Sequence, residues 1–189
     1  LDVGESTREP RLYYDNNTTG SLNLIDTAVK NDVKKIIFSS SATVYGEPDA
    51  IPIPESAPLR PINPYGHSKL MVEQLLLSYQ KTHGLEWLAF RYFNPIGAYD
   101  GIHQNPSVSN IVPVALRAIK SGQPMQVYGD DYDTTDGTGV RDYVDVVEIA
   151  RAHLMGADRV GACRAINLGS GSGYSVLQIL AAVGKAAGQ

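Results

Sequence analysis

The chain lacks the cysteines that a disulfide framework needs. Cys163 is the only cysteine among 189 residues, so no disulfide can form within the chain. Its surroundings, GACRAINLG, are typical of a buried strand, and we expect Cys163 to be a packed core thiol. The four histidines (His67, His83, His103 and His153) show no metal-ligand spacing. We therefore predict no metal site.

Long hydrophobic runs and an excess of positive charge are also missing. No apolar run approaches the roughly 18 residues that a membrane span needs, and no signal-peptide pattern is present. The formal net charge is -4, with Lys and Arg scattered singly. This excludes a basic footprint for nucleic acid and a polybasic membrane signal. We expect a cytoplasmic protein with neither a nucleic acid nor a membrane as partner.

What the chain does have is a regular alternation of helical and strand patterns. Strands end at glycine or at small polar residues, and helices begin at caps such as Ser175 with Gln178. Helices are expected at residues 9–31, 65–84, 111–122, 146–157 and 174–188. Strands are expected at 85–93, 125–129 and 163–169, and residues 34–46 are expected to form a short buried strand that ends in a loop. This order predicts an α/β fold, in which helices cover a largely parallel sheet.

Two polar segments look like ligand loops but are better explained as turns. GDDYDTTDG (129–137) fails the calcium-loop pattern because Thr135 stands where the third oxygen ligand should be, so we predict a solvated loop. NLGSGSGYS (167–175) has the spacing G-x-G-x-G, in which the third glycine comes one position early for a dinucleotide fingerprint. We predict a structural turn there.

Polar side chains follow the expected strands where ligands bind in open α/β sheets. Ser39 to Ser41 end the first strand, Asn94 ends the second and Ser170 ends the last. Ordinary turn chemistry explains each of these endings by itself, because turns favour Ser, Asn and Gly.

Tyr65 and Lys69 open the helix that follows the first strand. They are four positions apart, which places the phenol and the ammonium on the same helix face. The spacing alone fits two surface residues as well as a catalytic pair. With Ser41 ahead of them, however, three groups can converge on one point. A nearby ammonium favours the phenolate, and a serine can bond the same substrate oxygen. Ser41, Tyr65 and Lys69 therefore form a candidate acid/base group for hydride transfer at an alcohol.

Four segments in order resemble UDP-glucose 4-epimerases, of the extended short-chain dehydrogenase/reductase superfamily. They are FSSSATVYG (38–46), NPYGHSKLMVEQ (63–74), RYFNPIGA (91–98) and DGTGVRDYVDV (136–146). The resemblance implies an NAD-binding Rossmann-like fold with helices on both sheet faces and part of a smaller substrate domain. It implies that NAD takes hydride from C4 of a UDP-hexose and returns it through a transient 4-keto sugar.

The resemblance also implies roles for single residues. Tyr65 matches the catalytic acid/base, Lys69 the lysine that holds the nicotinamide ribose, and Ser41 the serine that bonds the sugar 4-oxygen. Cofactor contacts match Asn16 and Phe93, besides Ser41, Tyr65 and Lys69. Substrate contacts match Asn94, Asn110, Gln126, Val127, Tyr128 and Arg141, besides Ser41 and Tyr65.

Two positions disfavour a related reaction. Nucleotide-sugar 4,6-dehydratases carry Asp and Glu just after the serine or threonine, and these acids eliminate water. Ala42 and Thr43 stand there in this chain and cannot do so. Two alternatives stay open: a non-catalytic nucleotide-sugar or NAD-binding relative, and a superfamily dehydrogenase or reductase acting on another nucleotide sugar.

The resemblance leads to expectations about the organisation of the chain. Residues 1–94 are expected to be the C-terminal part of the NAD-binding domain, and 95–189 a mixture of substrate-domain segments and returning Rossmann elements. No glycine-rich dinucleotide turn matches the family's N-terminal one, so we expect a fragment that lacks this segment and the C-terminal end. The complete protein is expected to be a homodimer.

Overall fold

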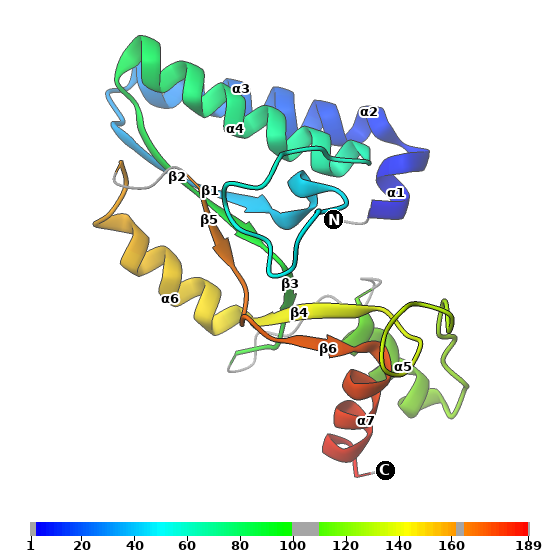
Figure 1. Cartoon of the computed structure of the whole chain (residues 1–189). Coiled ribbons are helices and arrows are strands. Elements are labelled where there is room, and N and C mark those ends of the chain that lie inside the picture. Colours follow the sequence, from blue (N-terminus) through cyan, green and yellow to red (C-terminus); the bar gives the residue numbers. More distant parts are fainter. Residues whose placement is uncertain (1–2, 100–109, 162–164, 189) are drawn as a thin grey trace. The chain divides into compact units, whose positions relative to one another are not determined.

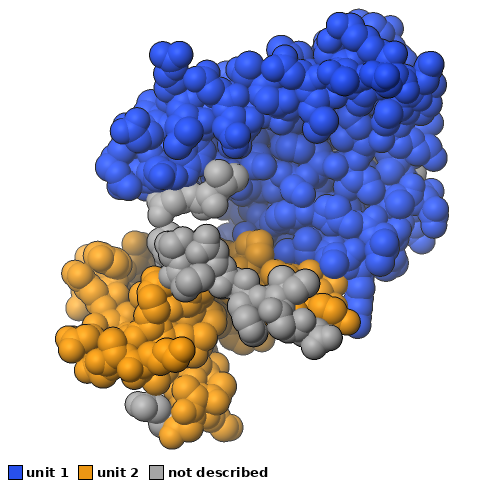
Figure 2. All heavy atoms as spheres, turned by 180° about the vertical axis from the view of Figure 1, so that it is seen from behind, with its two compact units in different colours: residues 1–93, 149–168 blue, residues 94–148, 169–189 orange. Residues whose placement is uncertain are grey.

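A computed structural model describes residues 3–99, 110–161 and 165–188 of the chain. Cys163 lies outside the described residues, so its expected packing stays a prediction. The chain divides into two compact units, coloured separately in Figure 2. Unit 1 comprises residues 1–93 and 149–168, and unit 2 comprises residues 94–148 and 169–189. The assignment of NAD-binding and substrate-binding domains to parts of the chain stays a prediction.

Unit 1 is built on a parallel sheet of three strands in the order β1-β2-β5. β1 (Lys35–Ser41) pairs along its whole length with β2 (Glu86–Tyr92), and β2 pairs with β5 (Ala165–Leu168). Ser41 lies opposite Tyr92, so the two strands end together. The serines of β1 are therefore at the carboxyl edge of the sheet, as the sequence predicted.

Helices cover both faces of this sheet (Figure 1). Trp87 and Ala89 of β2 join a core cluster with residues of α3 (Gly20–Lys30) and α4 (Pro64–His83). Leu88 and Phe90 point to the other face, where Ala152 of α6 (Val146–Ala157) packs against them. Successive strand residues alternate between faces, so β2 is buried on both. This confirms the predicted α/β fold.

The N-terminal helical stretch is less regular than predicted. α1 (Val3–Arg8), α2 (Pro10–Tyr13) and a π-helical segment (Tyr14–Thr19) precede α3. The sequence predicted one helix over 9–31 and did not predict α1. Helical periodicity detects the apolar face but not a single wide turn within it.

Unit 2 contains a second sheet of three strands in the order β3-β4-β6. β3 (Asn94–Ile96) runs parallel to β4 (Val140–Asp145), whereas β6 (Gly173–Ser175) is antiparallel to β4. The helices α5 (Ile111–Ser121) and α7 (Val176–Ala186) pack against each other. The predicted capping box of Ser175 and Gln178 opens α7.

One predicted strand is wrong. Residues 125–129 form no strand, although MQVYG has the composition of one. Tyr128 is 79% exposed, and a strand needs a partner that no described residue provides. By contrast, GDDYDTTDG forms the predicted loop. Of the glycines in NLGSGSGYS, Gly169 and Gly171 lie in the predicted turn, whereas Gly173 begins β6. No helix within the described ranges is long and apolar enough to cross a membrane.

Candidate active site

The start of α4 is specified locally and packs tightly against the end of β1. Asn63 caps the helix, since its side chain accepts a hydrogen bond from the Gly66 amide at 2.8 Å, and Pro64 occupies the first turn. A Cβ at Gly66 would lie 2.7 Å from the carbonyl oxygen of Thr43. Only glycine permits this approach, which brings the first turn of α4, with Tyr65, to the turn that follows Ser41.

Ser41 begins a 3₁₀ turn (Ala42–Tyr45) directly after β1. Its Oγ accepts hydrogen bonds from the amide of Thr43 at 3.3 Å and from Thr43 Oγ1 at 2.9 Å. The Ser41 side chain also lies close enough to Tyr65 to lower the pKa of its phenol. Because its oxygen already accepts two hydrogen bonds from Thr43, the Ser41 hydroxyl proton is available for donation.

The environment of Tyr65 favours the protonated phenol. Burial raises the pKa of Tyr65 above its usual value, and the Ser41 side chain opposes that rise. The prediction that Lys69 would lower this pKa is wrong for the chain by itself. The Lys69 ammonium is directed to a backbone oxygen instead, and desolvation of the phenolate is the larger effect.

Lys69 lies one turn further along α4. Its Nζ donates to the carbonyl oxygen of Ser39 at 2.9 Å and lies 5.0 Å from the ring centre of Phe38. The ring centre of Tyr65 is 5.8 Å from the same nitrogen. Burial lowers the pKa of Lys69, because it disfavours the charged ammonium. Ser41, Tyr65 and Lys69 therefore do converge at the carboxyl edge of the unit 1 sheet.

These residues fit the nicotinamide-ribose end of NAD. The Lys69 ammonium has three donors and uses one of them on Ser39, which leaves donors for ribose hydroxyls. Tyr65 has a raised pKa, which a positively charged ring bound nearby would lower. A positively charged nicotinamide held beside Tyr65 would favour its phenolate. No group of three or more His, Cys, Asp or Glu that could hold a metal ion occurs in the described part of the chain.

Asn16 and Phe93 are the other predicted cofactor contacts, and both are in unit 1. Asn16 is exposed on the π-helical segment, where its side chain donates to Asn17 Oδ1 at 3.3 Å. Phe93 follows β2 directly and is half-buried, and its amide donates to the carbonyl of Leu168. Their contacts with NAD stay predictions.

The predicted substrate-binding residues after Phe93 all belong to unit 2, and most are exposed. Asn94 is half-buried, and its side chain donates to the backbone oxygen of Asp142 at 2.8 Å. Asn110 precedes α5 without a side-chain capping bond, and Arg141 donates to the carbonyl of Val140 at 2.8 Å. No carboxylate in the described part of the chain pairs with Arg141. Gln126 and Tyr128 are exposed, and Val127 is half-buried.

Sequence reasoning missed a buried ion pair close to the candidate group. Glu73 of α4 and Arg91 of β2 form it, with 6% and 5% of their side chains exposed. Two signals could have found them. Arg91 interrupts an otherwise apolar buried strand, and Glu73 continues the four-residue spacing of Tyr65 and Lys69. Charged residues at such positions are paired when buried.

Asn17 was also missed, although its neighbour Asn16 was named. Asn17 is buried, and its side chain donates to Ser68 Oγ at 3.0 Å. Ser68 in turn donates to the carbonyl oxygen of Tyr65 at 2.7 Å. The π-helical segment is thereby tied to the first turn of α4.

Comparisons with known proteins agree with this arrangement. The model of the family described as "NAD dependent epimerase/dehydratase family" matches residues 2–169. The chain is 45% identical to a UDP-glucose 4-epimerase of Erwinia amylovora and 46% identical to one of Bacillus subtilis (strain 168). These alignments cover 98% and 99% of this chain, but 58% of each relative.

A solved structure supports the same relationship. The UDP-glucose 4-epimerase of Bifidobacterium longum, in complex with NAD+ and UDP, is 45% identical and has a TM-score of 0.89. The match covers 99% of this chain and 58% of that one. The chain thus spans somewhat more than half the length of the proteins it matches. With a family model matching most of its residues and an α/β architecture in agreement, the chain belongs to the NAD dependent epimerase/dehydratase family.

Proposed function

We propose that the protein containing this chain epimerises C4 of a UDP-hexose with NAD, interconverting UDP-glucose and UDP-galactose. The observation that carries the proposal is the convergence of Ser41, Tyr65 and Lys69 at the end of β1. The relatives named UDP-glucose 4-epimerase support the substrate. The Bifidobacterium longum structure, which holds NAD+ and UDP, supports the cofactor.

Each of the three groups has a distinct role in this proposal. NAD, when bound, accepts a hydride from C4 of the sugar and returns it to the opposite face. Tyr65 takes the proton of the 4-hydroxyl as the keto sugar forms and gives it back afterwards. Ser41 donates a hydrogen bond to the sugar 4-oxygen. Lys69 holds the nicotinamide ribose through the donors that its bond to the Ser39 carbonyl leaves unused.

The remaining predicted residues would bind the two ligands. Asn16 and Phe93 would contact NAD, while Asn94, Asn110 and Arg141 would contact the diphosphate of the UDP-sugar. Arg141 suits this role because it is exposed and its guanidinium can bond phosphate oxygens in a fork. Residues 126–128 would lie against the uracil as extended chain rather than as a strand.

The unit 1 sheet would belong to the NAD-binding domain, with residues 149–168 as its returning part, and much of unit 2 to the substrate domain. The complete protein would be a homodimer.

The test is turnover of UDP-galactose by the full-length natural protein, with absorbance at 340 nm followed in parallel. Formation of UDP-glucose without net NADH is the expected result. Net NADH accumulation would instead identify a dehydrogenase. Binding of UDP-galactose without any product would identify a non-catalytic relative. Either of these outcomes would refute the proposed epimerase.

A further inference from the structure

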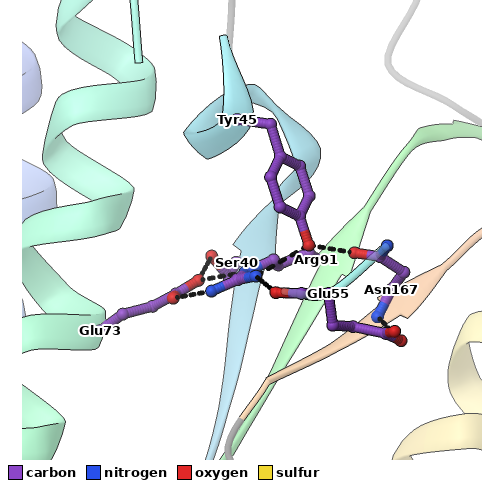
Figure 3. A network of polar contacts seen from close by, with 6 residues as sticks. All are labelled: Ser40, Tyr45, Glu55, Glu73, Arg91 and Asn167. Carbon is purple, nitrogen blue, oxygen red and sulfur yellow. Dashed lines mark hydrogen bonds and ion pairs between the residues drawn. The ribbon is translucent and has the colours of Figure 1, made fainter. Parts of the chain in front are cut away.

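We propose that Glu73 and Arg91 are positioning residues, which hold α4 in register with β1 and thereby set where Tyr65 and Lys69 lie relative to Ser41. The inference rests on the proposed function for its meaning in catalysis. Figure 3 shows the two side chains and the polar contacts around them.

The register of α4 against β1 is set by polar bonds at two successive turns. Tyr65, Lys69 and Glu73 share one helix face, because each is four residues after the previous one. Lys69 Nζ bonds the carbonyl oxygen of Ser39, and Ser40 Oγ donates to Glu73 Oε1 at 2.6 Å. Consecutive residues of β1 are therefore bonded to consecutive turns of α4. The next strand residue is Ser41.

Arg91 fixes the carboxylate of Glu73 from a second strand. Its Nε donates to Oε1 at 3.1 Å and its Nη2 donates to Oε2 at 2.7 Å. Such a fork restrains the plane of the carboxylate as well as its distance. Ser40 is 1% exposed, and the ion pair is almost as buried. Since β2 pairs with β1 along its whole length, α4 is held against both strands.

The same arginine also restrains the turn that starts at Ser41. Arg91 Nη1 donates to the hydroxyl of Tyr45 at 2.8 Å and to the backbone oxygen of Glu55 at 3.3 Å. Tyr45 ends that turn, and its hydroxyl donates to Asn167 Oδ1 at 2.7 Å. Arg91 thus connects the two elements that carry Ser41 and Tyr65.

The chemistry of the pair favours positioning over simple stabilisation. An ion pair loses hydration on burial, and an apolar pair of similar volume often stabilises a fold equally well. Hydrogen bonds are directional, so they restrain the orientation of α4 against the sheet more strongly than apolar contacts do. Misplacing a reacting group by about 1 Å can cost on the order of 10²-fold in rate. A fixed register between α4 and β1 therefore supports the rate of the reaction, because it keeps the reacting groups in place.

The experiment compares Glu73→Gln and Ser40→Ala with the wild type in the full-length natural protein. Glu73→Gln keeps the shape but removes the charge, and Ser40→Ala removes one bond between α4 and β1. With UDP-galactose we expect kcat to fall about 10-fold or more for Glu73→Gln and several-fold for Ser40→Ala, by analogy with misplaced catalytic groups. KM should stay within about twofold, since neither residue is predicted to touch substrate. If Glu73→Gln does not fold, Ser40→Ala carries the test.

Leu76→Val is the matched control for a purely structural effect. Leu76 is fully buried on the same helix and packs in the cluster with Val72 and Ile25. Shortening it should lower the melting temperature through a small cavity and leave kcat unchanged well below that temperature. If Glu73→Gln behaves in the same way as Leu76→Val, the positioning role is overturned.

A readout without turnover separates this inference from the proposed function. With tyrosine labelled at 13Cζ, the Tyr65 resonance, assigned through Tyr65→Phe, reports the surroundings of the phenol, which include Ser41. We expect this resonance to shift in Glu73→Gln and Ser40→Ala and to stay in place in Leu76→Val. Identical Tyr65 resonances in the wild type, Glu73→Gln and Ser40→Ala would overturn the positioning role. A shift in a protein that turns over no UDP-galactose would support positioning while refuting the epimerase.

Discussion

The two units place their candidate functional residues in very different environments. In unit 1, Ser41, Tyr65 and Lys69 sit on a strand end and a helix start that are packed and hydrogen-bonded to each other. In unit 2, Arg141 and Tyr128 extend from exposed positions. The difference corresponds to two tasks. Groups that move a proton need fixed geometry, whereas groups that bind a charged, polar ligand need access to it. Changes in unit 1 should therefore affect turnover and folding, and changes in unit 2 should affect binding.

The largest effect is expected for Tyr65→Phe. Turnover of UDP-galactose should fall by about 10³-fold, because the acid/base group is removed. Affinity for UDP, measured by calorimetry, should change little. Tyr79→Phe makes the same chemical change on the same helix, at a hydroxyl that bonds Asp26 at 3.3 Å, and should keep full turnover. Equal turnover of the Tyr65→Phe variant and the wild type would remove Tyr65 from the reaction.

Next in size is the loss of stability from Leu76→Ala. Leu76 is fully buried in the cluster that contains Trp87, the only tryptophan of the chain. Truncation should lower the free energy of unfolding by about 3 kcal/mol, followed by Trp87 fluorescence in urea. Tyr128→Ala in unit 2 removes a side chain of a residue that is 79% exposed and should cost less than about 0.5 kcal/mol. Similar losses for the two variants would contradict the contrast between the units.

Arg141→Ala should act on binding alone. Loss of a charge-assisted contact to phosphate should raise KM for UDP-galactose about tenfold or more, with kcat within about threefold. The melting temperature should not change, since the guanidinium bonds only the neighbouring Val140 carbonyl among the described residues. Arg151→Ala, at an exposed arginine of unit 1, should leave KM as it is. An unaltered KM in Arg141→Ala would show that another residue binds the diphosphate.

The smallest expected effect concerns alkaline pH and is concentrated in unit 1. Burial raises the pKa of Tyr45, Tyr65 and Tyr92 in unit 1 and of Tyr143 in unit 2. The unfolded chain begins to lose tyrosine protons near pH 10, whereas the folded chain still holds them. The stabilisation is therefore complete below about pH 10 and is lost as the pH rises further.

Lys69 changes the stability in the opposite direction. Burial lowers its pKa, so the free energy of unfolding rises with pH between this lowered pKa and about 10.4, where the lysine of the unfolded chain titrates. Since more tyrosines have a raised pKa than lysines have a lowered one, we expect a net loss of stability as the pH rises above 10. The urea midpoint of Trp87 fluorescence at pH 9 and at pH 11 measures it. A midpoint that rises with pH would show that Lys69 dominates.

Much of the fold could be predicted where local chemistry decides it. Asn63, Pro64 and Gly84 bound α4, and the structure places this helix at Pro64–His83 with Gly84 in a left-handed conformation. β3 and β6 were missed because each has only three residues. β4 was missed because its sequence, VRDYVD, shows no regular alternation of apolar and polar residues. The strand predicted at residues 125–129 is wrong because the prediction rested on composition alone, and composition does not show whether a neighbouring strand is there to pair with.

The candidate site shows the same limit. The spacing of Tyr65 and Lys69, with Ser41 before them, was enough to predict their convergence. The pairing of Glu73 with Arg91 joins residues on different elements and depends on how these pack, which local pattern does not encode. The raised pKa of Tyr65 likewise depends on burial in the folded chain. The four-residue spacing of Tyr65 and Lys69 in the sequence predicted a lowered pKa for Tyr65 instead.

The discontinuity of unit 1 has a consequence for the order in which the chain can fold. β1, α4 and β2 follow one another closely, so they can associate early through local contacts. β5 must pair with β2 from across residues 94–148, which belong to the other unit. During synthesis one edge of β2 stays open until Leu168 has emerged, and Asn167 joins Tyr45 only then. Nascent chains that stall before this point would expose a hydrophobic strand edge to chaperones and to aggregation.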